Sequence, residues 1–348
     1  MHKIKWLLCL AMVFIITGCT PVAPEQKSET PKEYSRSEFV VGTIVSIKIF
    51  EDGSEEILDE IFSRLTEIEA RMSFNSEQSE VKDVNAGAGV VPVTVSADTF
   101  DVVSSAVEFA EKSKGLFDPT IGPLVQLWGI GSEGAAIPSD QDRENAIQLI
   151  DWKQVELNGY ENSIYLKTEK MEIDLGAIAK GYASDEVVRI LKENNVKRGI
   201  INLGGNVYAY GEKPDGSAWR IGVQNPFSNR GEYIGIVEIK NKSVVTSGIY
   251  ERYFEEDGVR YHHILNSQTG FPVNNELASV TIFSEHSIDA DALSTILFAA
   301  GIEQGKMFLE TYYPDVEAIF ITMDKLVYTT DLSSYNLEWT DSTFKLQP

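Results

Sequence analysis

The chain has 348 residues, a formal net charge of −23 and only two cysteines, Cys9 and Cys19. Its length allows one large α/β unit or two to three smaller domains. The acidic balance argues against nucleic acid and anionic lipid headgroups as partners, because both would be repelled.

The N-terminus has the pattern of a secretory signal peptide. Lys3 and Lys5 precede an apolar run from Trp6 to Ile16, and Ile16-Thr17-Gly18-Cys19 has the order of a lipobox. The run is about half of the ~20 residues that a transmembrane helix needs. We therefore expect residues 1–18 to be removed, Cys19 to carry lipid and leave the body without a free thiol, and the protein to sit at the extracytoplasmic face of the cell membrane. Residues 19–38, with several prolines and polar side chains, are expected to form a disordered tether.

Residues 39–348 are expected to form one mixed α/β body with largely antiparallel strand pairing. Period-two alternation predicts a strand over 39–50, and apolar residues three and four apart predict a helix over 54–72. A second helix is expected over 96–114, with Ser96 as its cap and Gly115 just past its end. Further strands are expected at 200–203, 219–223, 234–239, 279–283 and 318–322, and further helices at 177–194, 289–300 and 302–313.

Two glycine-rich segments carry ionisable groups. In Gly115–Leu124, Phe117 and Asp118 precede Pro119, which is also a common turn or helix start. In Ile173–Asp185, a strand is expected to run through glycine into a helix whose N-terminus and Lys180 would favour an anion. The plainer reading is tight packing with Lys180 in solvent. Neither a P-loop nor a dinucleotide fingerprint is present.

Two more segments supply a candidate base and a candidate metal site. His262 and His263 are adjacent, so on a strand they face opposite sides, and one can act as a general base with a pKa near working pH or be a structural residue. If Asp291 begins a helix, Thr295 lies above it, and these hard oxygen donors suit magnesium. The alternative is that Asp291 is an N-cap and Thr295 bonds back to its own helix.

Taken in order, seven segments resemble the ApbE family of flavin transferases over about residues 41–330. They are Val41-Gly42-Thr43, Phe117–Leu124, Asp174–Asp185, Asn202–Asn206, Thr246–Phe254, His263–Pro272 and Ala290–Thr295. The resemblance implies an α+β (mixed α/β) fold of two interlocked lobes with the cofactor cleft between them. It also implies an enzyme that splits FAD with Mg²⁺, moves FMN onto a Thr or Ser hydroxyl of a partner protein, and releases AMP.

The resemblance also implies roles for individual residues. His263 would be the base, and the Ala177 carbonyl, Asp291 and the Thr295 hydroxyl, with Ser294 close by, would hold Mg²⁺. FAD would be contacted by residues from several segments: Val41, Phe74, Phe117, Asp118, Pro119, Asp174, Lys180 and Ile264.

Three positions depart from the family pattern. Val41 stands where Met is usual, Asn266 replaces an Asp after the His motif, and Ser294 stands where some members carry a second Asp. The first change affects packing on the ligand, the second removes a carboxylate beside His263, and the third removes one charge from the metal site.

The resemblance implies that the acceptor is an exported or membrane-embedded electron-transport subunit with a Thr-containing flavinylation motif. Two other functions stay open: an FAD pyrophosphatase that makes FMN and AMP, and a flavin-binding lipoprotein without catalytic activity. The intact Asp291, Thr295 and His263 speak against a passive binder, which needs neither a metal nor a base.

Overall fold

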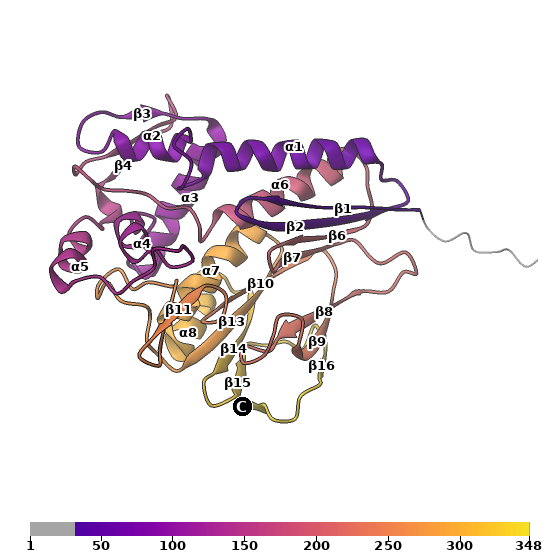
Figure 1. The fold of residues 1–348 in the computed structure, drawn as a ribbon. Coiled ribbons are helices and arrows are strands. Elements are labelled where there is room, and N and C mark those ends of the chain that lie inside the picture. The colour runs from indigo at the N-terminus through magenta and orange to yellow at the C-terminus, as the bar shows by residue number, and fades with distance from the viewer. Residues whose placement is uncertain (1–31, 348) are drawn as a thin grey trace, which may run out of the picture. The chain divides into compact units, whose positions relative to one another are not determined.

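The computed structural model describes residues 32–347 (Figure 1). The expected signal peptide, Cys19 and the expected tether up to residue 31 lie outside the described residues. Residues Lys32–Pro348 form one compact unit, so the two expected lobes are not separate domains. Within the described stretch, no helix combines the length and apolar character needed to cross a bilayer.

The framework is a nine-stranded sheet in the order β1-β2-β6-β7-β10-β13-β14-β15-β17. Every neighbouring pair is antiparallel except β15 with β17, which confirms the expected pairing. The strands are β1 Glu33–Val40, β2 Thr43–Phe50, β6 Gly199–Leu203, β7 Asn206–Tyr210, β10 Lys242–Gly248, β13 Leu277–Ser284, β14 Glu317–Thr322, β15 Leu326–Thr329 and β17 Lys345–Leu346.

The start of the sheet corrects two expectations. The tether cannot reach residue 38, because Glu33–Val40 pairs with β2 along its whole length. The strand expected over 39–50 is in fact two strands that turn at Val41 and Gly42. The sequence of β1 is mostly polar. This segment is therefore a strand because it pairs with β2 and not because of its own composition.

Eight helices lie within the described residues: α1 Glu55–Met72, α2 Glu80–Ala86, α3 Ala97–Ser113, α4 Gly122–Trp128, α5 Asp140–Ile147, α6 Ala179–Glu193, α7 Ser287–Ala300 and α8 Ile302–Tyr312. The five longer helices, α1, α3, α6, α7 and α8, confirm the helices expected from the sequence. The three short helices, α2, α4 and α5, were not predicted. Ser96 caps α3 as expected, accepting from the backbone N–H of Thr99, and Ser54 caps α1 in the same way, accepting from that of Ile57. Gly115, just past α3, has a φ of 83°.

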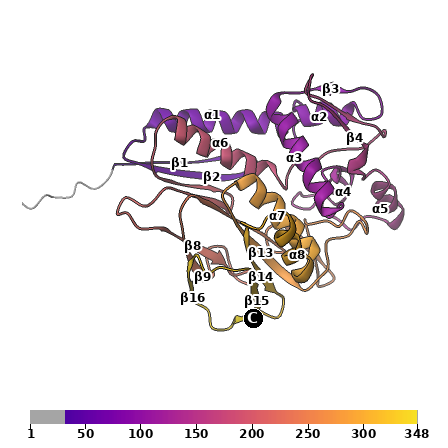
Figure 2. The ribbon, with the colours of Figure 1, turned by 180° about the vertical axis from the view of Figure 1, so that it is seen from behind.

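Three smaller sheets complete the fold. They are β16-β9-β8, with strands Asn336–Trp339, Tyr233–Ile239 and Trp219–Gln224; β3-β5-β4, with Val93–Thr94, Ser163–Leu166 and Val155–Asn158; and the hairpin β11-β12, Tyr253–Glu256 with Val259–His262. Helices α1 and α6 run alongside β1 and β2, and α7 packs on β10 and β13 (Figures 1 and 2). The sheet β16-β9-β8 packs on the large sheet through a second apolar cluster that includes Val237 and Phe283.

The segment before α6 differs from its prediction. Ile173 and its neighbours do not form a strand. Instead the Asn85 side chain bonds both backbone groups of Ile173, donating to its oxygen at 3.1 Å and accepting from its nitrogen at 2.7 Å. The Asp174 N–H donates to the Pro119 carbonyl at 2.8 Å. The extended segment is thus held by a side chain and a loop in place of a neighbouring strand.

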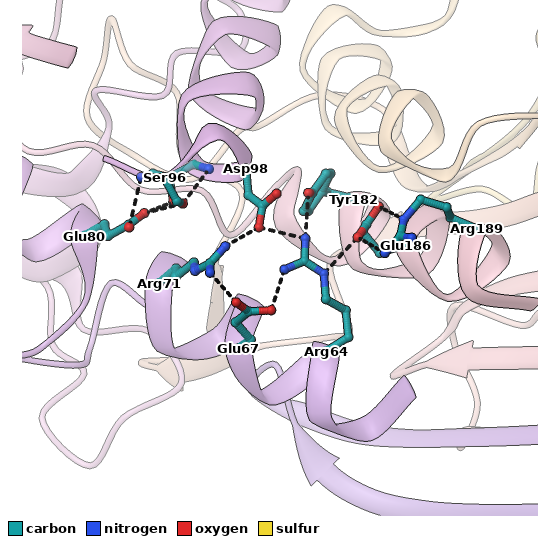
Figure 3. A network of polar contacts seen from close by, with 10 residues as sticks. Arg64, Glu67, Arg71, Glu80, Ser96, Asp98, Tyr182, Glu186 and Arg189 are labelled. Carbon is teal, nitrogen blue, oxygen red and sulfur yellow. Dashed lines mark hydrogen bonds and ion pairs between the residues drawn. The ribbon is translucent and has the colours of Figure 1, made fainter. Parts of the chain in front are cut away.

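A network of charged side chains joins α1 to α3 and α6 (Figure 3). Arg64 of α1 lies 2.7 Å from Asp98 at the start of α3 and 2.8 Å from Glu186 of α6. Burial alone would raise the pKa of Asp98, but the hydrogen bond and charge of Arg64 outweigh it and hold that pKa below its usual value. In the same network Glu80 of α2 accepts from the Ser96 N–H and hydroxyl. These contacts fix the end of α1, which leads directly into the cavity described next.

Candidate functional site

A cavity of about 470 Å³ opens where several distant parts of the chain meet. It is lined by the turn of the β1–β2 hairpin, the end of α1, the start of α6, the middle of α7 and the loops around β10 and β12. Small-molecule sites typically have volumes of about 300–1,000 Å³. The volume of this cavity is therefore that of a ligand-binding site rather than of a gap left by imperfect packing.

Most of the residues singled out in the sequence line this cavity. They are Val41, Phe74, Phe117, Asp118, Asp174, Ala177, Lys180, His263, Ile264, Asp291 and Thr295. Since these residues come from positions 41 to 295, only the folded chain brings them together.

Pro119 and Ser294 were also singled out but do not line the cavity. Pro119 supplies the carbonyl that holds the Asp174 N–H. The buried Ser294 hydroxyl donates to the Asp291 carbonyl at 2.8 Å and lies 2.7 Å from the Ser247 hydroxyl. Ser294 therefore ties α7 to β10 behind the cavity, and its expected place beside a metal has no support in this geometry.

The hairpin turn at the cavity rim has an unusual backbone. Val41 and Gly42 have φ values of 54° and 65°, and positive φ at both central residues is typical of a type I′ turn. A β-branched residue is rarely found there, because its side chain crowds the backbone. Glu69 of α1 accepts the Gly42 N–H at 3.0 Å and so fixes the turn against the helix.

The Asp291 carboxylate is the most heavily bonded group in the cavity. Only 4% of Asp291 is exposed. Its oxygens accept from the Gly181 N–H at 3.0 Å, from the Asn206 amide at 2.9 Å and from the Lys180 ammonium at 3.2 Å. Lys180 also donates to the Gly176 carbonyl at 3.1 Å. A positive charge is thus held between a carboxylate and a backbone carbonyl.

This oxygen-rich pocket fits a hard cation. Asp291, Thr295 and Ala177 all line it, and Mg²⁺ prefers the oxygen donors that such residues carry and keeps several waters. Between residues 32 and 347 there is no group of three or more His, Cys, Asp or Glu side chains that could hold a metal. A cation here would accordingly rest on one carboxylate, neutral oxygens and ligand phosphates, and it would compete with the Lys180 ammonium.

Asp291 does not begin α7, contrary to the expectation. The helix begins at Ser287, so Asp291 lies in its second turn, and the N-cap alternative is wrong. The first two N–H groups of α7, from Ser287 and Ile288, donate to the Asp185 carboxylate at 2.8 and 2.9 Å. Burial raises the pKa of Asp185 to about 6. Asp185 therefore caps α7, and Asp291 is left facing the cavity.

The side chains of the two adjacent histidines lie in different surroundings, as expected. His262 is buried, and its ring donates to the Val273 carbonyl at 2.9 Å and accepts from the Ile264 N–H at 3.3 Å. Burial lowers the pKa of His262 to about 4. Both ring nitrogens are thus engaged, and His262 is the structural member of the pair.

His263 lines the cavity, and its Nδ1 lies 3.3 Å from the Arg252 carbonyl. A carbonyl can only accept, so Nδ1 carries the hydrogen and Nε2 keeps its lone pair. Burial, with the charge of Arg252, lowers the pKa of His263 to about 3, which corrects the expected value near neutrality. Asn266 does not serve as its partner, because the Asn266 side chain accepts from the N–H groups of Gln268 and Thr269.

Two further carboxylates, those of Asp118 and Asp174, belong to residues that line the cavity. Asp174 accepts from the Gly176 N–H at 2.7 Å, and burial raises its pKa while the charges of Arg252 and Lys180 oppose the rise. Asp118 accepts from the Thr120 N–H and hydroxyl at 2.9 and 2.6 Å. Asp118 thus forms the turn proposed as its plainer role while also lining the cavity.

The remaining wall is largely apolar. Met72, Phe74, Trp128 and Ile264 line it together with Phe117, whose ring lies 6.1 Å from that of Phe109. Trp128 is fixed by donating its ring N–H to the Gly270 carbonyl at 2.7 Å. The cavity therefore offers an aromatic and aliphatic wall beside a polar part that contains Lys180. This combination suits a flat aromatic ligand that carries phosphate.

Several other lining residues have no role assigned from the sequence, and of these Arg252, Asn206 and Glu69 carry polar contacts or charge. Arg252 and Asn206 lie inside motifs that were recognised, but neither was given a role. Glu69 lies on α1, where helical periodicity accounts for the apolar face and says nothing of a polar residue. The motifs that contain Arg252 and Asn206 could have pointed to these two residues, whereas no feature of the sequence pointed to Glu69.

The fold and the cavity define an enzyme of mixed α/β architecture. The model of the ApbE family matches residues 41–320, so this chain belongs to the ApbE family and is a transferase. The chain is 38% identical to the FAD:protein FMN transferase of Treponema pallidum (strain Nichols), over 85% of this chain and 86% of that protein. It is 39% identical to the enzyme of the same name from Klebsiella pneumoniae (strain 342), over 84% and 90%.

Solved structures agree with this assignment. The crystal structure of the ApbE protein from Thermotoga maritima has a TM-score of 0.76 and 32% identity, covering 89% of this chain and 98% of that one. The flavin transferase ApbE from Vibrio cholerae has a TM-score of 0.76 and 28% identity, over 90% and 99%. The expected mixed α/β fold of this family is confirmed.

Proposed function

We propose that this protein moves the FMN half of FAD onto a threonine or serine hydroxyl of an acceptor protein and releases AMP. The main support is one cavity in which an aromatic wall, the Lys180 ammonium and the Asp291–Thr295 oxygen donors lie together. The names of the similar enzymes from Treponema pallidum and Klebsiella pneumoniae support the same reaction.

In the proposed step, the acceptor hydroxyl oxygen bonds to the phosphorus of the FMN half. The bond from that phosphorus to the bridging oxygen breaks, and AMP leaves with the bonding electron pair. The hydroxyl proton passes to Nε2 of His263, the ring nitrogen with a free lone pair. Phosphoryl transfer depends mainly on placement and electrostatics, which the cavity supplies through fixed side chains.

Asp291, the Thr295 hydroxyl and the Ala177 carbonyl would hold Mg²⁺, and bound Mg²⁺ would neutralise charge on the diphosphate. Lys180 is held near the same oxygens and is free to pair with a phosphate oxygen when a divalent cation takes its position. Arg252 lines the cavity and adds a second positive charge. An anion beside His263 would raise the pKa of the ring from about 3 toward its ordinary value and make it a better base.

The location of the reaction is part of the proposal. Lipidation at Cys19 would hold the enzyme at the outer side of the cell membrane, where an exported or membrane-embedded electron-transport subunit would be the acceptor. Labelling cells with an alkyne fatty acid tests the anchor. The chain is expected to carry the label and to sediment with membranes, whereas the Cys19→Ser variant is expected to lose both properties; label retained by that variant would contradict the assignment.

A transfer assay tests the activity with residues Lys32–Pro348, which form a compact unit. The protein is incubated with FAD, Mg²⁺ and a pool of synthetic 12-residue peptides, each with one central threonine. Flavin fluorescence that stays with a peptide under denaturing conditions, together with an equal amount of AMP, is the expected result. AMP and FMN without labelled peptide would indicate a pyrophosphatase, and bound but intact FAD would indicate a passive flavin binder.

A further inference from the structure

Next to the cavity, the β1–β2 hairpin carries two large apolar side chains in solvent. Phe39 is 74% exposed and Ile44 is 65% exposed. They are direct cross-strand partners, so their side chains lie on the same face about 5 Å apart. The next pair of partners, Val40 and Thr43, leads into the turn, and Val41, Gly42 and Thr43 all line the cavity.

This face of the hairpin is the one that α1 leaves uncovered. Val45, Ile47 and Ile49 of β2 alternate with Ile44 and are buried in the main core, which includes the apolar face of α1. Neither Phe39 nor Ile44 belongs to a core cluster of the described residues. This face of the β1–β2 hairpin is thus an ordered strand surface that presents two apolar side chains at the edge of a ligand cavity.

The same face becomes polar away from the cavity. One step further along the hairpin, the hydroxyls of Ser37 and Ser46 lie 2.8 Å apart, and Lys48 follows beyond them. An apolar centre with a polar surround is typical of a protein docking site, where a few buried side chains supply most of the affinity.

We infer that Phe39 and Ile44 are the docking point for a polypeptide segment of the acceptor protein. The inference rests on the proposed function, because transfer to a protein hydroxyl requires a protein segment at the cavity rim. Phe39 lies two residues from Val41, and a strand rises about 3.3 Å per residue. The acceptor segment therefore carries an apolar side chain within about four residues of its reactive threonine or serine.

The test uses the peptide pool described above with three variants of residues Lys32–Pro348. Phe39→Thr and Ile44→Thr keep a residue that suits a strand and remove the apolar group. Met307→Thr is the matched control, because Met307 is 60% exposed on α8 and does not line the cavity. FAD binding and the urea unfolding midpoint show whether each variant keeps its fold and its cavity.

The native sequence is expected to label peptides with an apolar residue at a fixed distance from the threonine. In both hairpin variants that preference is expected to disappear and KM for a selected peptide to rise about tenfold or more, with kcat, FAD binding and the control unchanged. Unchanged peptide preference and KM would overturn the inference while leaving the transferase function intact. If the native sequence binds FAD but labels no peptide, the proposed function is contradicted, and the docking point inferred from it is contradicted as well.

Two other occupants of the patch would also overturn the inference. A dimer of residues Lys32–Pro348 that both hairpin variants dissociate would assign the pair to a second copy of this chain. Binding to phosphatidylcholine vesicles that the variants lose, with peptide preference unchanged, would assign it to lipid.

Discussion

At the residue scale, His262 and His263 show how position decides the role of a side chain. Both rings are neutral near pH 7 because burial lowers their pKa values. Only His263 lines the cavity, and its Nε2 lone pair is free while Nδ1 faces the Arg252 carbonyl. His263 is therefore the member of the pair that we propose as the general base.

Replacing His263 with alanine is expected to slow flavin transfer by about 10²–10⁴-fold and to leave FAD affinity nearly unchanged, because the base acts on the acceptor proton. Rates of peptide labelling and FAD fluorescence titrations measure the two effects. His286→Ala is the control, since His286 is exposed at the start of α7 and does not line the cavity. An undiminished transfer rate in His263→Ala would remove His263 from this role.

Val41 is a second residue at this scale, and its backbone conformation predicts how a substitution changes stability. A β-branched residue at a φ of 54° is strained by about 1–2 kcal/mol, and asparagine is favoured at this position of such a turn. Val41→Asn is expected to raise the free energy of unfolding by about 1 kcal/mol and to weaken FAD binding, because an apolar contact with the ligand is lost. Urea unfolding and FAD titration measure both.

Val41→Gly separates the two causes. It relieves the backbone strain without placing a polar side chain on the cavity, although the added freedom of the unfolded chain offsets part of the gain. A lower stability of Val41→Asn than of the native sequence would contradict the strain argument.

The sequence predicted many of the cavity residues but not their mutual contacts. Asp291 was recognised by its spacing to Thr295 and by the family resemblance. Its bonds to Gly181 and Asn206 could not be predicted, because these partners lie about 110 and 85 positions away along the chain. For the same reason the low pKa of His263 was missed: it follows from burial and from the Arg252 charge, which exist only in the fold.

At the element scale, Arg64 holds α1 against α3 and α6. Its side chain is 15% exposed, and removing it takes one of two arginine partners from each of the carboxylates of Asp98 and Glu186, which are themselves largely buried. Arg64→Met is expected to lower the free energy of unfolding by about 2–3 kcal/mol. Arg220→Met is the control, because Arg220 is 44% exposed and its pairs with Glu238 and Glu338 lie at the surface, away from this network. Equal losses in the two variants, measured by urea unfolding, would contradict the structural role of Arg64.

The elements differ in how well the sequence could predict them. Helices α1 and α3 were predictable because a serine cap and a regular apolar face lie within one segment. β1 was not, because its polar sequence becomes a strand only through pairing with β2. The extended segment at Ile173 has a strand-like sequence, but its bonds go to the distant side chain of Asn85 and not to a neighbouring strand.

At the scale of the whole molecule, the lowered pKa values of His262 and of the half-buried His263 make stability depend on pH. In the unfolded chain His263 takes up a proton below about pH 6.5, whereas its pKa of about 3 keeps it neutral in the folded protein. The unfolded state therefore binds more protons between these values, so acid destabilises the fold. Asp185 acts in the opposite sense, since its pKa of about 6 lets the folded state take up a proton first.

The His263 contribution can be isolated by comparing the native sequence with His263→Gln. As pH falls from 6.5 to 4.5, the native sequence is expected to lose more stability than the variant, by up to about 1.4 kcal/mol per pH unit. Urea unfolding at pH 7, 5.5 and 4.5 gives the two slopes. Identical slopes would show that His263 is not held neutral by the fold.

We expect cleavage of FAD to depend on a divalent cation that Asp291 and its neighbours hold. The most direct measurement is a Mg²⁺ titration of AMP release and of the unfolding temperature with FAD bound, for the native sequence, Asp291→Asn and Asp289→Asn. Asp289 is the control because it lies in the first turn of the same helix, α7, and does not line the cavity. Asp291→Asn is expected to lose AMP release by about 100-fold or more together with the stabilisation by Mg²⁺, while the control keeps both. Full Mg²⁺-dependent activity and stabilisation in Asp291→Asn would contradict the account.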